Sequence, residues 1–139
     1  MTGAGRVAFA AAAAVAVIGA VVAGLIVLGP PREQRARRLD DRRLDDLREI
    51  AGAVDLHWTR DGRLVASLEE VKMELRPSSD RDPETGEPYV YEPLGADRYR
   101  LCATFSGATP TEAYRPRSEF WTHGAGRHCF ELEAKKIER

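Results

Sequence analysis

The chain has 139 residues, with 21 basic and 22 acidic side chains, so its formal net charge is −1. A chain of this length holds one small domain besides any tails or anchors. The balanced charge argues against a nucleic-acid-binding protein with a strongly basic face, and we expect no nucleic-acid partner. The charges are unevenly spread, because the first 29 residues carry one charged side chain and the remaining 110 carry 42. The two parts therefore suit different solvents.

An apolar, uncharged segment runs from Val7 to Leu28. As a helix rising 1.5 Å per residue it is about 33 Å long, which is enough to cross a hydrocarbon core of about 30 Å. Gly29, Pro30 and Pro31 then end the segment. A cleaved signal peptide would have a shorter apolar region, followed by a cleavage site between small residues. The sequence thus predicts an uncleaved single-pass transmembrane helix over residues 7–28, after a short tail of residues 1–6, with the lipid bilayer as its partner.

A charged segment follows and is predicted to be a stalk or linker over residues 29–43. It contains the start of a tandem repeat, Arg-Arg-Leu-Asp-Asp, at 37–41 and 42–46. Positive charge close to a span favours the cytoplasmic side, so this segment taken alone places the rest of the chain in the cytoplasm. The six arginines concerned are Arg32, Arg35, Arg37, Arg38, Arg42 and Arg43.

Two helices are predicted in the soluble part. Apolar residues recur at three- and four-residue spacing between Leu44 and Trp58, which indicates an amphipathic helix running from Arg32 to about Trp58. Ser67 and Glu70 have the spacing of a capping box, so we expect a short helix from Ser67 to about Leu75.

Strands are predicted to follow a loop over residues 77–88. Residues 89–91 are aromatic and β-branched, and residues 99–105 alternate between apolar and other side chains. The alternation places Tyr99, Leu101, Ala103 and Phe105 on one face.

A second hairpin is predicted after a further loop over residues 106–117. It joins residues 120–122 to residues 128–133 through a glycine-containing connection. The expected fold class is α+β, with a domain over residues 44–133 in which a long helix packs on three or four antiparallel strands. Residues 134–139 are expected to be a frayed, charged tail.

The order of these features resembles that of the type IV pilin-like proteins, and most closely the major pseudopilin of bacterial type II secretion. The resemblance is carried by Ser-Leu-Glu-Glu-Val at 67–71, by Asp-Pro-Glu-Thr-Gly-Glu-Pro-Tyr-Val-Tyr at 82–91, and by the strand at 99–105. It implies a pilin-like fold and an exported, membrane-anchored domain. The residues of the family motif to which it gives a structural role are Asp82, Pro83, Gly86, Pro88 and Tyr89.

Filament assembly is not carried over from this resemblance. Pilins and pseudopilins have a glutamate inside the apolar segment and a peptidase site before it, whereas no residue from 7 to 28 is acidic. We therefore expect the fold and the anchor of the family without its usual processing.

Cys102 and Cys129 are the only cysteines. An even pair in an exported domain suggests a disulfide, in agreement with the resemblance. In a cytoplasmic domain the same residues would be two buried thiols.

A metal site is the main chemical alternative, because Cys102, His123, His128 and Cys129 include the ligand types that zinc prefers. Their spacing matches no standard zinc site, and His128 and Cys129 are adjacent, so on a strand they point to opposite faces. The acidic loop with Asp80, Asp82, Glu84 and Glu87 is a second, weaker candidate, for calcium. We expect no cofactor and no catalytic residues.

These observations predict a single-pass membrane protein that displays a pseudopilin-like domain outside the cytoplasm. Its role would be structural or in protein interaction, with other membrane or envelope proteins, or a second copy, as partners. The alternatives are an anchored docking domain that faces the cytoplasm, as the arginines favour, and a metal-binding domain that uses the cysteines and histidines.

Overall fold

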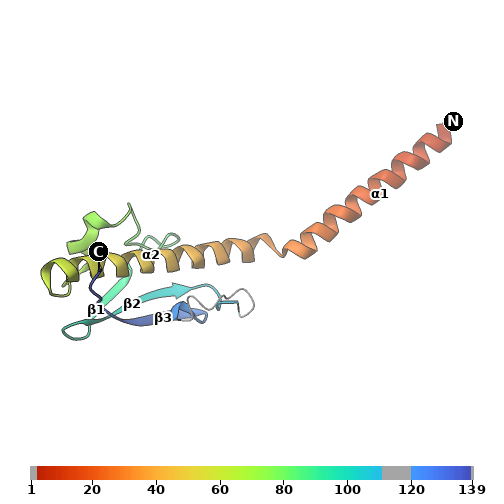
Figure 1. Ribbon diagram of the computed structural model, residues 1–139. Helices are drawn as coiled ribbons and strands as arrows, with labels where there is room; N and C mark the ends of the chain where they lie inside the picture. The colour runs from red at the N-terminus through yellow and green to blue at the C-terminus, as the bar shows by residue number, and fades with distance from the viewer. Residues whose placement is uncertain (1–2, 111–119, 139) are drawn as a thin grey trace. The chain divides into compact units, whose positions relative to one another are not determined.

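A computed structural model describes residues 3–110 and 120–138. The fold class is α+β, as predicted, and the chain divides into two compact units, Met1–Arg35 and Ala36–Arg139. Its elements, labelled in Figure 1, are α1 (Gly3–Leu28), α2 (Pro31–Asp61), the 3-10 helix η1 (Leu68–Glu74), β1 (Val90–Pro93), β2 (Arg98–Phe105) and β3 (Gly126–Glu133).

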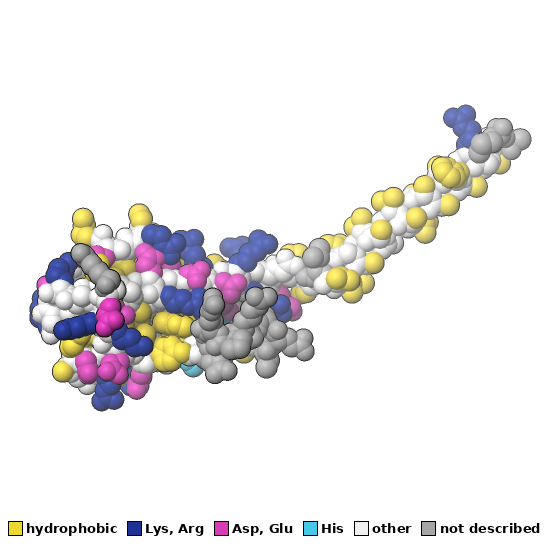
Figure 2. All heavy atoms as spheres, viewed as in Figure 1, with side chains coloured by type: hydrophobic (Ala, Val, Ile, Leu, Met, Phe, Trp, Pro, Cys, Tyr) yellow, Lys and Arg dark blue, Asp and Glu magenta, His cyan; other side chains and the backbone are white. Residues whose placement is uncertain are grey.

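Helix α1 has 26 residues and starts at Gly3, so the described part of the expected tail is helical. Its described apolar side chains are exposed, and Figure 2 shows apolar side chains along the length of the helix. The helix ends before Gly29, whose φ of +74° lies in the left-handed region that glycine adopts without strain. Pro31 then begins α2, because a proline at the first helical position loses no intrahelical hydrogen bond.

Helix α2 has 31 residues and ends three residues beyond the predicted Trp58. It lies along one face of the sheet (Figure 1). Its buried apolar face recurs at the predicted spacing and forms the core together with the inward side of the strands. The buried apolar residues of the helix are Leu44, Leu47, Ile50, Ala51, Ala53 and Val54.

The expected stalk ends earlier than residue 43. Asp40 and Arg43 lie inside the packed unit, with 7% and 3% of their surface exposed. A charged repeat was expected to stay solvated, but these two charges pair with each other, and each has further hydrogen-bond partners elsewhere in the fold. The domain therefore extends toward the N-terminus beyond the predicted boundary at residue 44.

The sheet has three antiparallel strands in the order β1-β2-β3. The predicted alternation of β2 is confirmed, because Tyr99, Leu101, Ala103 and Phe105 are all buried against the helix. Cys102, between the core residues Leu101 and Ala103 of β2, has Val90 of β1 as its register partner on one side and Cys129 of β3 on the other. The cysteines therefore share the face that points away from the core residues of β2.

The predicted helix after Ser67 is a 3-10 helix, and Ser67 makes no side-chain capping hydrogen bond. Glu70 instead accepts a hydrogen bond from the backbone N–H of Ala66 at 2.7 Å. Glu70 thus accepts from the backbone of Ala66 instead of from the backbone of Ser67, which the predicted capping box would use.

The predicted strand at residues 120–122 is wrong. Phe120 and Trp121 lie in a short 3-10 turn and pack their rings on Phe130, with centroids 6.0 Å and 4.9 Å away. The preference of aromatic residues for strands reflects packing on a half-buried surface, and these two rings find such a surface without joining the sheet. The preceding loop is described only as far as residue 110, so residues 111–117 of the prediction lie outside the described residues.

The end of the chain is docked rather than frayed. Ala134 is buried, and two backbone N–H groups beyond it donate to side chains of α2. Lys135 donates to Asp55 Oδ1 and Ile137 donates to Thr59 Oγ1, each at 2.9 Å.

Candidate functional site

The motif at residues 82–89 folds into a tight turn. The Asp82 N–H donates to the carbonyl of Glu87 at 2.8 Å, and the Gly86 N–H donates to the carbonyl of Asp82 at 2.9 Å. Gly86 has a φ of +73°, so glycine is needed there. The side chain of Asp82 also accepts the N–H groups of Glu84 and Thr85 at 2.9 and 3.0 Å. The predicted turn role of Gly86 thus agrees with the geometry.

A buried arginine on α2 holds this turn in place. Arg43 Nε donates to Asp82 Oδ2 at 2.6 Å, and its Nη2 donates to Asp82 Oδ1 at 3.1 Å, which is a two-pronged pair. The same Nη2 donates to Glu84 Oε2 at 2.8 Å. Helix α2 is thereby tied to a loop about forty positions later in the sequence.

A second branch of this cluster reaches the end of β2. Arg43 Nη1 donates to Asp40 Oδ1 at 2.9 Å and to Ser106 Oγ at 3.2 Å. Asp40 in turn accepts the backbone N–H groups of Ser106 and Gly107 at 2.8 and 3.0 Å. We call this set the Arg43 cluster: Asp40, Arg43, Asp82, Glu84 and Ser106.

The electrostatics of the Arg43 cluster favour its charged form. Burial alone would raise the pKa of Asp82, but hydrogen bonds from Arg43 and from the backbone of Thr85 and Glu84 outweigh it and lower the pKa to about 2. The hydrogen bond to Asp82 is the largest influence on Arg43 and raises the pKa of its guanidinium. Asp82 and Arg43 are therefore an ion pair throughout the physiological pH range.

Tyr89 links the motif to the buried side of α2. Its hydroxyl donates to Asp46 Oδ2 at 3.0 Å, and burial followed by the nearby Asp46 charge raises the pKa of Tyr89. Asp46 is only 1% exposed, and its Oδ1 has no hydrogen-bond donor among the described residues. Burial raises the pKa of Asp46, against the hydrogen bond from Tyr89 and the charges of Arg42 and Arg76.

An open groove of about 430 Å³ lies beside the Arg43 cluster, where β1 no longer pairs with β2. Polar and apolar side chains both line it, and the charged ones come from α2, from the 82–88 turn and from β3. Residues that line it include Asp82, Glu84, Glu87, Pro88, Thr104 and Arg127.

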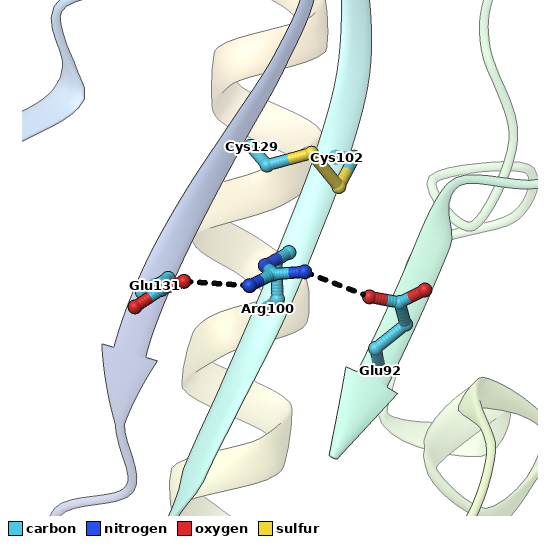
Figure 3. The surroundings of a disulfide bond; sticks show 5 residues. All are labelled: Glu92, Arg100, Cys102, Cys129 and Glu131. Atoms are coloured by element: carbon cyan, nitrogen blue, oxygen red, sulfur yellow. Dashed lines mark hydrogen bonds and ion pairs between the residues drawn. A yellow bond between two sulfur atoms is a disulfide. The ribbon is translucent and has the colours of Figure 1, made fainter. Parts of the chain in front are cut away.

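Cys102 and Cys129 form a disulfide, as predicted. They are direct partners in the β2–β3 register, with Cα atoms 4.1 Å apart. Figure 3 shows the bond on the sheet next to Arg100, which donates to Glu92 of β1 at 3.2 Å and to Glu131 of β3 at 2.7 Å. The outer face of the sheet thus carries one covalent and two ionic cross-strand links.

The four alternative metal ligands do not combine in this oxidised form. Both sulfurs are used in the disulfide, so neither supplies a thiolate. The His123 ring stacks on the Phe105 ring with the ring centroids 3.6 Å apart, and the His128 ring packs on the Phe130 ring with the centroids 4.7 Å apart. Among the described residues, no group of three or more His, Cys, Asp or Glu is arranged to hold a metal ion. In the acidic loop, the guanidinium of Arg43 takes the position between Asp82 and Glu84 that a cation would need.

Arg43, Asp40 and Asp46 are buried, although their charges predicted exposed positions. A signal existed for Arg43, which lies four residues before Leu47 and seven before Ile50, on the stripe of the helix that faces the core. Its positive charge argued against burial, because a buried arginine is rare unless partners are supplied from elsewhere in the chain.

The contacts of the Arg43 cluster and the disulfide join segments that are far apart in the sequence. The guanidinium of Arg43 is shared among three carboxylates, and the two cysteines are bonded to each other. Comparisons with protein-family models, with curated proteins and with solved structures found no match for this chain.

Proposed function

We propose that this chain is a single-pass membrane-anchored protein that displays a small, disulfide-bonded, pilin-like domain on the outer side of the membrane. Its role is structural or one of protein interaction, without catalysis. The observation that carries the proposal is α1, whose most apolar 18-residue stretch has a mean hydropathy of 2.7 and buries nothing against the described protein. A helix so apolar and so exposed needs a non-aqueous environment.

The pilin-like assignment is supported by the order of the elements. One long helix is followed by an antiparallel sheet that packs on it, and the residues of the family motif form the turn that leads into β1. Within the motif, Asp82 is held by Arg43 and Tyr89 donates to Asp46, which favours a structural role for both.

The outward orientation is supported by the disulfide, since disulfides persist in oxidising compartments. The opposite orientation, an anchored docking domain in the cytoplasm, is favoured by the exposed arginines after the span. These two candidates differ in sidedness and can be separated directly.

The test uses the full chain with a reporter at its C-terminus. We expect the protein to stay in the membrane pellet after alkaline carbonate extraction. We also expect activity from a reporter that folds only outside the cytoplasm and none from one that fluoresces only inside it. A carbonate-soluble protein would contradict the anchor, whereas a fluorescent, membrane-bound fusion would contradict the orientation and leave the anchor standing.

A further inference from the structure

The described arginines differ in whether a carboxylate lies nearby. Eight of them lie within 4 Å of a carboxylate: Arg42, Arg43, Arg48, Arg60, Arg63, Arg76, Arg81 and Arg100. Four others lie on the first turns of α2, and no described carboxylate comes that near to any of them. We call these four the arginine band: Arg32, Arg35, Arg37 and Arg38.

The arginine band is strongly cationic and open to its surroundings. All four side chains are exposed. Residues 31–38 contain these four arginines and one acid, Glu33, so their net charge is 4 − 1 = +3. The rest of the chain has a net charge of −1 − 3 = −4, so this local excess of positive charge is not a feature of the overall composition.

The band lies close to the end of α1 along the chain, whatever the angle between the two compact units. Arg32 comes four residues after Leu28, a distance that cannot exceed about 15 Å even for an extended chain. The helical rise then limits the band itself to a length of about 9 Å. If α1 spans the bilayer, the side chains of the arginine band therefore lie at the depth where the phospholipid headgroups meet water.

We propose that the arginine band binds the phosphate groups of anionic phospholipids, in the leaflet on the domain's side of the membrane. A guanidinium presents two parallel N–H donors that fit a phosphate, and it is more weakly hydrated than an ammonium group. Negative surface potential adds to this attraction, by roughly fivefold in affinity for each nearby arginine. The band would therefore fix the base of α2 to the lipid surface instead of serving only as a spacer. This inference rests on the proposed anchoring by α1.

The test uses the full chain in nanodiscs made from phosphatidylcholine and phosphatidylglycerol at a bulk ratio of about 3:1. The lipids that stay bound to the protein after release into mild detergent are counted by native mass spectrometry. We expect the wild-type chain to retain phosphatidylglycerol at least about threefold above its bulk share, and less so as the salt concentration rises.

Two variants with the same change in charge separate the band from overall charge. R35Q/R38Q removes two arginines of the band, whereas R98Q/R127Q removes two exposed arginines of the sheet that likewise lack an ion-pair partner among the described residues. The first variant should lose much of the enrichment and R32Q/R35Q/R37Q/R38Q should lose nearly all of it, while R98Q/R127Q should keep it.

Three results would overturn the inference: no enrichment in the wild-type chain, full enrichment in the fourfold variant, or an equal loss in R98Q/R127Q and R35Q/R38Q. A wild-type chain that does not enter nanodiscs at all would overturn the proposed anchor as well, so the two failures are distinguishable.

Discussion

At the scale of single residues, Arg43 determines how three separated segments meet. It donates to a helix residue, to two residues of the 82–88 turn and to Ser106 after β2, while only 3% of its own surface is exposed. Removing Arg43 alone is costly, because the carboxylates of Asp40 and Asp82 then stay largely buried without a compensating positive charge.

Replacing Arg43 with methionine is therefore expected to lower the free energy of unfolding by about 3–5 kcal/mol. R43K should recover part of the loss, since it restores the charge but not the two-pronged geometry toward Asp82. Denaturant unfolding of the full chain in detergent, followed by circular dichroism, measures both. The matched control is R63M, which breaks an exposed pair with Glu70 and should cost much less, because water and salt screen exposed pairs. Equal losses in R43M and R63M would refute the role assigned to Arg43.

Asp46 is expected to make the fold less stable as the pH rises. Burial raises its pKa in the folded state, so its favourable contribution is complete below the unfolded pKa and is lost as pH rises through the folded value. Asp46→Asn keeps an acceptor for the Tyr89 hydroxyl and has no charge to bury. The variant should thus gain stability relative to wild type as the pH rises above the ordinary aspartate pKa of about 4.

The measurement for Asp46 is the difference in free energy of unfolding between variant and wild type across that pH range. Asp45→Asn, at an exposed position on the same helix, is the control and should show no such gain. A difference that stays flat with pH for Asp46→Asn would show that its carboxylate is not penalised by burial.

At the scale of elements, the disulfide joins β2 to β3 across a sequence separation of 27 residues. Closing a loop of that length restricts the unfolded chain, which is worth about 3–4 kcal/mol on the chain-entropy model. Cys102→Ala with Cys129→Ala should lower the free energy of unfolding by about that amount. Reductant should produce the same loss in the wild type and none in the double variant. A reductant effect that persists in the double variant would refute this attribution.

The long amphipathic helix and the three strands were predictable because their signals are local. The three- and four-residue spacing of Leu44, Leu47 and Ala51 marks the buried face of α2, and the alternation in β2 marks its buried side. These patterns depend only on neighbours along the chain.

The elements that the sequence reasoning missed depend on distant contacts. Phe120 and Trp121 have strand-forming side chains, yet their surroundings are set by Phe130 and leave them outside the sheet. Arg43 is buried because Asp82 and Glu84 come to it from another part of the chain. The segment 82–88 was predicted to be a loop that resembles the pseudopilin motif. Its hydrogen bonds to α2 could not be predicted, because they depend on the three-dimensional fold.

At the scale of the whole molecule, the chain combines an apolar helix with a polar domain that satisfies its own buried charges. Helix α1 is exposed throughout its described side chains, whereas the unit from Ala36 onward has a closed core. The proposed anchor, the outward orientation and the disulfide are linked, because the compartment of the domain decides whether the cysteines stay oxidised.

One measurement tests this combination most directly: the intact mass of the protein extracted from native membranes, with thiols blocked at lysis and no reductant added. We expect a mass that retains residues 1–29, carries no blocking groups and is two hydrogens lighter than that of the reduced chain. Two blocked thiols would contradict the oxidised, outward-facing domain, and a mass that lacks the N-terminal helix would contradict the anchor.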